Sequence, residues 1–161
     1  MRKFEKISLN EFIKDTKLTE KEYNEIILPK RATQNSAGYD FHILENITIK
    51  PNEIKKIPTG IKASMNNDEV LMIYIRSSLG FKYNLRLCNG TGIIDSDYYN
   101  NEDNEGHIFI AIQNEGDKAI TLKAKDRFVQ GIFVKYLKVD NEDEIANDRH
   151  GGIGSTNERE E

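Results

Sequence analysis

Residues 85–98 read Leu85-Arg86-Leu87-Cys88-Asn89-Gly90-Thr91-Gly92-Ile93-Ile94-Asp95-Ser96-Asp97-Tyr98. Apolar runs flank Asn89-Gly90, a pair that tolerates positive φ and is a strong signal of a β-hairpin. The returning run delivers a carboxylate, Asp95, and a ring, Tyr98. Such a hairpin suits a flat ring held by backbone amides beside a carboxylate that activates water. Taken alone, the stretch fits an ordinary hairpin with a solvated aspartate at least as well, so other segments must decide.

The middle of the chain predicts a β protein. Short runs rich in Ile, Val, Phe and Tyr alternate there with turn residues, and the runs are 43–49, 54–57, 70–75, 85–88, 108–112, 120–122 and 128–136. Seven or more short strands without helical periods between them indicate an all-β barrel or sandwich. We therefore expect a β core over residues 29–138.

The two ends of the chain differ from this core. Residues 1–28 are expected to form a helical extension, because Ser8-Leu9-Asn10-Glu11 and Thr19-Glu20-Lys21-Glu22 fit the capping-box pattern and Pro29 follows. Residues 139–161 begin with an acidic run and continue into a glycine-rich segment. We expect a flexible C-terminal arm there.

Composition narrows the classes of function. The formal net charge of −4 argues against a nucleic-acid surface, which needs a basic field. No apolar run approaches the roughly 18 residues that span a bilayer, and the N-terminus lacks the apolar core of a secretory signal. The single cysteine, Cys88, excludes an internal disulfide and a cysteine zinc cluster. We expect one cytoplasmic domain with no membrane or nucleic-acid partner. No metal-binding spacing links the histidines, which are His42, His107 and His150.

A second segment with chemical potential is Arg76-Ser77-Ser78-Leu79-Gly80, which follows an apolar run. A guanidinium fork and two hydroxyls at the end of a strand form a compact receptor for an oxyanion. An exposed arginine at an ordinary strand end fits these residues equally well.

A third segment lies near the C-terminus, where Gly151, Gly152 and Gly154 stand between Arg149 and Ser155-Thr156. Glycines let backbone N–H groups approach phosphate oxygens closely, and the flanking groups add charge-assisted bonds. The alternative is a flexible linker, although plain linkers rarely carry an arginine and two hydroxyls around three glycines.

Two further segments carry polar groups among apolar neighbours. Asp40 in Ala37-Gly38-Tyr39-Asp40-Phe41 is expected either to pair inside the protein or to hold the hydration shell of Mg²⁺. In the last long run, Gln130 suits a bond to a phosphate or an ordered water. Arg127 in the same run fits a structural ion pair at least as well as a functional role.

Together, and in this order, the segments resemble the trimeric deoxyuridine triphosphate nucleotidohydrolase (dUTPase) family over roughly residues 28–156. The five family motifs read here as 37–40 (AGYD), 76–80 (RSSLG), 92–98 (GIIDSDY), 127–130 (RFVQ) and 149–156 (RHGGIGST). The resemblance implies a jelly-roll-like β fold and a homotrimer with shared active sites. It also implies Mg²⁺-assisted hydrolysis of dUTP to dUMP and pyrophosphate, which limits uracil entry into DNA and supplies dUMP for dTMP synthesis.

The resemblance also implies roles by position. Asp95 is expected to act as general base on the water that attacks the α-phosphorus. Tyr98 would pack under the deoxyribose and exclude a 2′-hydroxyl, and the uracil edge would be read by the backbone at Asn89, Gly92 and Ile94. Phosphates would be held by Arg76, Ser77, Ser78 and Gln130, and closed over by Arg149, Gly154, Ser155 and Thr156. Mg²⁺ would be held mainly through the phosphates, with water-mediated or supporting roles for Asp40, Asp97 and Arg127.

Two features depart from the family pattern. Ile153 stands where the family tail usually carries a phenylalanine that stacks on uracil, and residues 100–105 form an insertion before Gly106. We expect His107 or Tyr99 to supply the missing ring contact. An unchanged KM for dUTP in both His107→Ala and Tyr99→Ala would contradict this hypothesis.

Two alternatives remain at this stage. A dCTP deaminase on a related fold needs a glutamate in the strand after the base hairpin, and Ala111 stands at that position. A regulatory protein on the same fold would bind nucleotide and a protein partner without turnover. Residues 100–105 and the N-terminal segment are the candidate partner surfaces.

Overall fold

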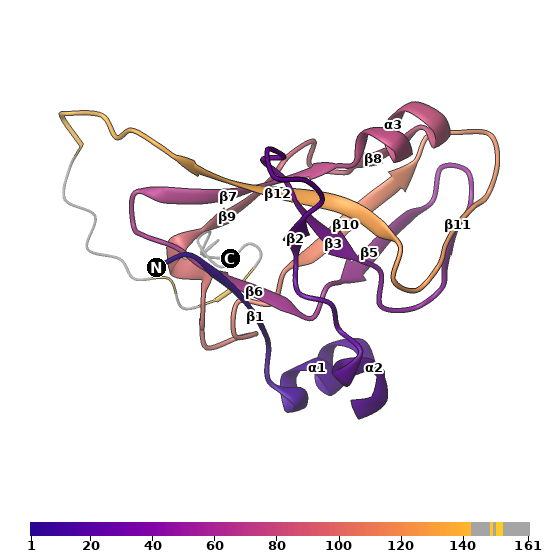
Figure 1. The fold of residues 1–161 in the computed structure, drawn as a ribbon, viewed down its shortest axis with the longest axis horizontal. Coiled ribbons are helices and arrows are strands. Elements are labelled where there is room, and N and C mark those ends of the chain that lie inside the picture. Colours follow the sequence, from indigo (N-terminus) through magenta and orange to yellow (C-terminus); the bar gives the residue numbers. More distant parts are fainter. Residues whose placement is uncertain (143–148, 150, 153–161) are drawn as a thin grey trace, which may run out of the picture.

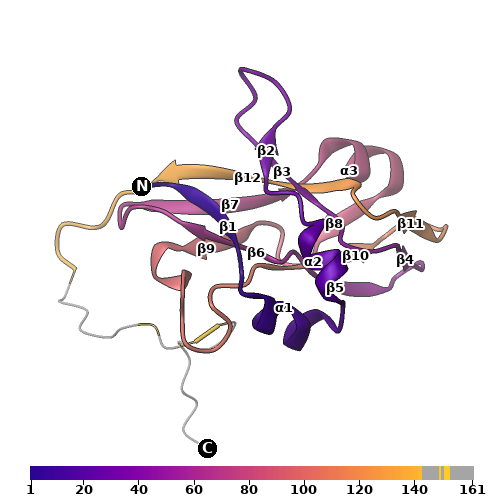
Figure 2. The same ribbon diagram turned by 60° about the horizontal axis from the view of Figure 1, so that its bottom comes forward.

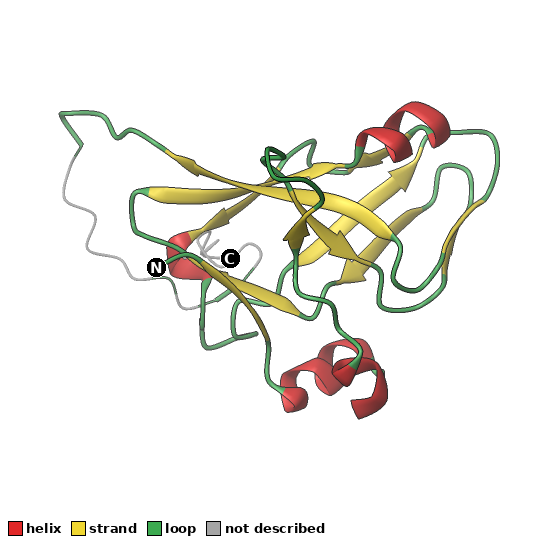
Figure 3. Ribbon diagram, in the orientation of Figure 1, coloured by secondary structure: helices red, strands yellow, loops and turns green. Residues whose placement is uncertain are grey.

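The computed structural model describes residues 1–142, 149, 151 and 152 (Figure 1). Within these residues strands dominate and the helices are short, as the colours of Figure 3 show. The helices are α1 (Leu9–Thr16), α2 (Glu20–Asn24) and α3 (Ser77–Tyr83), with a 3-10 turn at Ser96–Tyr98. The strands are β1 (Lys3–Lys6), β2 (Lys30–Arg31), β3 (Tyr39–His42), β4 (Ile47–Ile49), β5 (Ile54–Pro58), β6 (Ile61–Ser64), β7 (Glu69–Ile75), β8 (Leu85–Leu87), β9 (Gly92–Asp95), β10 (Phe109–Asn114), β11 (Ile120–Leu122) and β12 (Arg127–Lys135).

The described strands form antiparallel sheets that enclose one core. The largest sheet has the order β2-β3-β12-β7-β9, and the second has the order β5-β10-β8. Two-stranded sheets pair β11 with β4 and β1 with β6. Figure 2 shows β12 and β7 running above β5 and β10. The all-β, jelly-roll-like fold expected from the sequence, with short N-terminal helices, is confirmed.

Period-two alternation decides which side chains of a strand enter the core. In β10, Ile110 and Ile112 face inward and are 4% and 0% exposed, whereas Phe109 and Ala111 face the other way. Phe41 and Phe128 fill the core from β3 and β12. The outward face of β10 is therefore available to line a site.

The N-terminal segment is not helical throughout. Lys3–Lys6 forms β1, which pairs with β6, so the helical prediction for residues 1–28 is wrong there. Both predicted caps form, and that of α2 is a complete capping box between Thr19 and Glu22. At α1 the Ser8 side chain accepts a hydrogen bond from the Glu11 N–H. The Glu11 carboxylate, however, forms an ion pair with Lys14 and does not accept from the Ser8 N–H. The sequence alone does not reveal β1 because three of its four residues are charged and Phe4 is its one apolar residue.

One other local prediction holds and one needs correction. Arg76 directly follows the end of β7 at Ile75, as predicted, and it is also the N-cap of α3. Asn89-Gly90 does form a turn, with Gly90 at a φ of 70°, but the turn does not close a hairpin. Its flanking strands enter different sheets, β8 beside β10 and β9 beside β7. The division of the chain at residues 28 and 138 stays a prediction.

Among the described residues, no helix has the length and apolarity to cross a membrane.

Candidate active site

A cavity of about 280 Å³ lies beside β9 and the outward face of β10. Six of the predicted site residues line it, namely Asn89, Gly92, Ile94, Asp95, Tyr98 and Arg149. Ligand cavities in proteins begin at about 300 Å³, so the volume suits a small group such as a nucleoside. The turn at Asn89-Gly90 and the strand β9 thus place backbone groups, a carboxylate and a ring around one space.

Asp95 ends β9, and its carboxylate is 50% exposed at the cavity. Arg149 Nη2 lies 2.8 Å from Asp95 Oδ2, and Arg149 Nε lies 2.8 Å from Asp97 Oδ1. One guanidinium therefore bridges the two carboxylates of the 92–98 motif. The structure thus brings the arginine of the C-terminal motif to the residue predicted to be the base.

Tyr98 is buried, and its hydroxyl is fully engaged by the protein. The hydroxyl donates to the His107 carbonyl at 2.8 Å and accepts from Asn104 Nδ2 at 2.9 Å. Burial raises the pKa of Tyr98, so the phenol stays neutral at physiological pH. Tyr98 is a fixed wall of the cavity and not a proton donor to a ligand.

Asp40 lies in a charge cluster away from this cavity. Arg76 Nε approaches Asp40 Oδ1 at 3.0 Å, and Arg127 Nη1 approaches Asp40 Oδ2 at 3.1 Å. The Asp40 side chain is 8% exposed, so two guanidinium groups offset the cost of its burial. The structure thus favours internal pairing for Asp40 and an ion-pair role for Arg127.

The predicted phosphate-binding residues lie apart from Asp95. Ser77 and Ser78 are exposed on the first turn of α3, and Gln130 lies on β12 opposite Asp40. A Cβ at Gly38 would lie 2.3 Å from Gln130 Oε1, so the glycine leaves room for this side chain. Neither these residues nor Arg76 line the cavity. One chain therefore holds two separate halves of the predicted site.

A protein-family model described as dUTPase matches residues 24–157, five-sixths of the chain. The chain belongs to the dUTPase family. A deoxyuridine 5'-triphosphate nucleotidohydrolase of Lactococcus lactis is 48% identical over 132 residues, covering 81% of this chain and 88% of that relative. The crystal structure of dUTPase from Streptococcus mutans matches with a TM-score of 0.70 at 42% identity, covering 85% and 98% of the two chains.

A more distant structure shares the fold. The D95N mutant dUTPase from phage phi11 of Staphylococcus aureus matches with a TM-score of 0.67 at 18% identity, over 91% of this chain and 97% of that one. Its description reports the coordination of a structural Mg(II) ion in that protein.

The lining also includes Phe109, which sequence reasoning did not select, and Ala111, the position that weighs against a deaminase. Both lie on the outward face of β10, opposite the core residues Ile110 and Ile112. Isoleucine at every second position of residues 108–112 was the signal that could have shown this facing, in a run whose five residues are all apolar. In this dUTPase-family chain, Phe109 is therefore an aromatic ring in the cavity, and Ala111 leaves no carboxylate at its position.

His107 and Tyr99 do not stack in the cavity. The prediction for His107 is wrong, because its side chain is completely buried and bonded to Asp15 and to the Gly60 N–H. Tyr99 also lies outside the lining and donates its hydroxyl to Glu5. Of the predicted tail residues, Arg149 is placed as described above. Gly154, Ser155 and Thr156 lie outside the described residues.

Within the part of the chain that the structure describes, no group of three or more His, Cys, Asp or Glu side chains could hold a metal ion. A single carboxylate such as Asp40 still fits Mg²⁺, which is commonly bound through substrate phosphates and one or two carboxylates. Asp40 uses one position on each oxygen for arginine, so lone pairs remain for a water on the ion.

We expect acid to weaken the fold from about pH 6.5 downward. Burial lowers the pKa of His107 despite the adjacent Asp15, and burial likewise lowers the pKa of His42. The unfolded chain then binds more protons than the folded chain below the usual histidine pKa, so stability falls as pH falls. The slope is at most about 1.4 kcal/mol per pH unit for each histidine. Urea midpoints at pH 7.5, 6.5 and 5.5 measure it, and a midpoint that rises toward pH 5.5 would contradict it.

Proposed function

We infer that this chain hydrolyses dUTP to dUMP and pyrophosphate. The observation that carries this inference is a cavity of nucleoside size, in a dUTPase-family chain, that is lined by both Asp95 and Tyr98. A cavity of this size holds the base and sugar, and the triphosphate extends from it toward Asp95 and solvent.

Asp95 acts as the general base on the water that attacks the α-phosphorus. A carboxylate that reaches the proton of the water contributes about 10²–10⁴-fold to the rate. Without substrate, Arg149 bridges Asp95 and Asp97. The triphosphate competes for this guanidinium, so substrate binding moves Arg149 onto the phosphates and releases Asp95 to take a proton.

The base and sugar are recognised by shape and by backbone groups. Asn89, Gly92 and Ile94 present backbone donors and acceptors to the uracil edge. Tyr98 is held against the sugar by its bonds to His107 and Asn104, so little room remains for a 2′-hydroxyl. Donor and acceptor mismatch rejects cytosine, and lack of space rejects the thymine methyl.

Phe109 supplies the aromatic contact to the base. Phe109→Ala should raise the KM for dUTP about tenfold with little change in kcat, because stacking on a base is worth about 1–3 kcal/mol. Steady-state kinetics of purified variants test this. Tyr99→Ala is the matched control, since it removes a ring outside the cavity, and its KM should match the native value. Equal KM values for Phe109→Ala and the native chain would contradict the role of Phe109.

Mg²⁺ is the cofactor proposed for this reaction; it would be held mainly through the substrate phosphates, and Asp40 would contact one of its waters. When bound, the ion neutralises charge that develops on the phosphate oxygens. The chain itself contributes Arg76, the hydroxyls of Ser77 and Ser78, and Gln130 as phosphate ligands. Asp40 keeps Arg76 oriented through their 3.0 Å contact.

The active protein is a homotrimer with shared active sites. Supporting this, Arg76 and Gln130 do not line the cavity that contains Asp95 in their own chain. A second copy whose α3 lies beside the cavity would bring its Arg76 to the Asp95 of the first chain. A closed cyclic assembly satisfies every site in the same way.

Two alternatives are less well supported. Deamination of dCTP lacks a proton shuttle because Ala111 lines the cavity where a glutamate is needed. A regulatory role without turnover has no specific observation in its favour, and residues 100–105 are anchored to the chain by Asn101, Asn104 and Asp103. The cytoplasmic location stays a prediction from the single reduced cysteine.

Product analysis tests the proposed reaction. The chain, Mg²⁺ and dUTP are incubated in ¹⁸O-labelled water, and the products are identified by mass spectrometry. We expect dUMP carrying the label and unlabelled pyrophosphate, and no dUTP from a parallel sample of dCTP. Label in the pyrophosphate would contradict attack at the α-phosphorus, and dUTP formed from dCTP would favour the deaminase.

A further inference from the structure

The insertion at residues 100–105 is clamped onto the N-terminal helix. The Glu105 carboxylate accepts from the Ser8 N–H at 2.9 Å and from the Ser8 hydroxyl at 2.5 Å, so it replaces Glu11 as the partner that completes the cap of α1. Lys14 Nζ donates to the Asp103 carbonyl at 3.1 Å. Segments about ninety residues apart in the chain are thus joined at several points.

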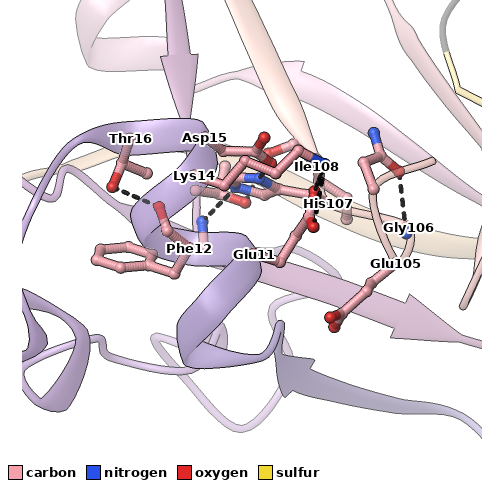
Figure 4. Close-up of polar contacts among 12 residues, drawn as sticks. Glu11, Phe12, Lys14, Asp15, Thr16, Glu105, Gly106, His107 and Ile108 are labelled. Atoms are coloured by element: carbon pink, nitrogen blue, oxygen red, sulfur yellow. Dashed lines mark hydrogen bonds and ion pairs between the residues drawn. The ribbon is translucent and has the colours of Figure 1, made fainter.

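The innermost contact joins Asp15 to His107. Asp15 Oδ2 lies 2.6 Å from His107 Nδ1, and His107 Nε2 lies 2.8 Å from the Gly60 amide nitrogen (Figure 4 shows the first pair). Because a backbone N–H can only donate, Nε2 must accept, and Nδ1 carries the proton that is donated to Asp15. The His107 ring is fully buried, so both of its nitrogens need these partners.

The same histidine fixes the cavity wall through its backbone. The His107 carbonyl accepts the Tyr98 hydroxyl at 2.8 Å, and the His107 N–H donates to the Asn104 carbonyl at 2.9 Å. Asn104 Nδ2 in turn donates to the Tyr98 hydroxyl at 2.9 Å. At Gly106, with a φ of +83°, a Cβ would lie 2.6 Å from the Tyr98 carbonyl, so the loop has little room to shift.

Local helix stability does not explain Asp15. It lies in the last turn of α1, where a negative charge faces the negative end of the helix dipole. Aspartate also has a lower helix propensity than alanine. The hydrogen bond to the buried His107 is the interaction that stabilises a carboxylate at this position.

We propose that Asp15 is a positioning residue for the nucleoside cavity, acting through His107 to hold Tyr98 in place. This proposal rests on the proposed function. Asp15 and α1 lie outside residues 24–157, which the family model matches. The N-terminal helix is thus part of the substrate-recognition machinery of this chain and not only a surface extension.

Asp15→Ala tests the proposal. Loss of a hydrogen bond to a charged group costs enough to predict a rise of about tenfold in the KM for dUTP, with kcat within about twofold of native. Discrimination of dUTP over UTP should fall by a similar factor, because Tyr98 gains freedom to admit a 2′-hydroxyl. Asp15→Asn, whose amide oxygen still accepts from Nδ1–H, should restore both values.

Thr19→Ala is the matched control. It removes the cap of α2, destabilising the same N-terminal segment without touching the insertion or Tyr98. Its melting temperature should fall while its KM and its dUTP/UTP ratio stay native. An Asp15→Ala chain with native KM and native dUTP/UTP ratio would overturn the proposal. Should Asp15→Ala not fold, Asp15→Ser carries the same test with the same two outcomes. A folded native chain without dUTP turnover would instead refute the proposed function.

Discussion

Asp95→Asn should lower the kcat for dUTP by about 10³-fold, within the range that a positioned general base contributes. The substitution keeps the size of the side chain and one hydrogen-bond acceptor, but an amide cannot take a proton from water at neutral pH. Asp95 ends β9 with half of its carboxylate exposed, so the change should leave the fold intact. Single-turnover kinetics with saturating enzyme measure the chemical step directly.

Asp97→Asn is the matched control for this experiment. It removes the other carboxylate that Arg149 bridges while leaving Asp95 in the cavity. We expect its kcat to stay within about tenfold of native, because Asp97 acts through Arg149 and not on water. Equal losses in the two variants would show that the arginine bridge, and not proton transfer by Asp95, governs the rate.

Mixed trimers of Asp95→Asn and Arg76→Ala chains should recover roughly a quarter of the native activity. Each chain alone should be nearly inactive, since one lacks the base and the other a guanidinium on the phosphates. If a site takes Asp95 from one chain and Arg76 from another, random mixing leaves both intact in roughly one site in four. Co-refolded mixtures and the activity of each parent measure this. Asp40 keeps Arg127 as a partner in Arg76→Ala, which limits the loss of stability.

Pairing Asp95→Asn with Tyr98→Ala gives the contrasting mixture. Both residues line the cavity of a single chain, so no mixed site contains both native side chains. This mixture should show no recovery. Recovery with Tyr98→Ala, or none with Arg76→Ala, would contradict sites shared in this way.

Several features of the site are readable from the sequence because they depend on local order. The run from Asn89 to Tyr98 folds into a turn, a strand and a 3-10 turn, so its carboxylate, ring and backbone groups meet in one cavity. Alternation in β10 follows equally directly from its Ile residues. The family resemblance, now confirmed, rests on motifs of this local kind.

Other features depend on contacts between distant segments and could not be predicted. Asn89-Gly90 was expected to close a hairpin, but the pairing of β8 with β10 and of β9 with β7 separates its two arms. His107 was expected in the cavity. It is instead buried against α1, where its side chain is hydrogen-bonded to Asp15, ninety-two residues away in the chain. No local pattern indicates which of several acidic residues on a short helix will meet a buried imidazole.

The most direct test of the central claim is the rate of pyrophosphate release by the native chain with Mg²⁺ and equal concentrations of dUTP, UTP, dCTP and dTTP. The proposed function predicts release from dUTP and little from the other three, because Tyr98 is proposed to close the cavity to a 2′-hydroxyl and the β9 backbone to read one base edge. A folded chain that binds dUTP and releases no pyrophosphate would contradict the assignment of a hydrolase.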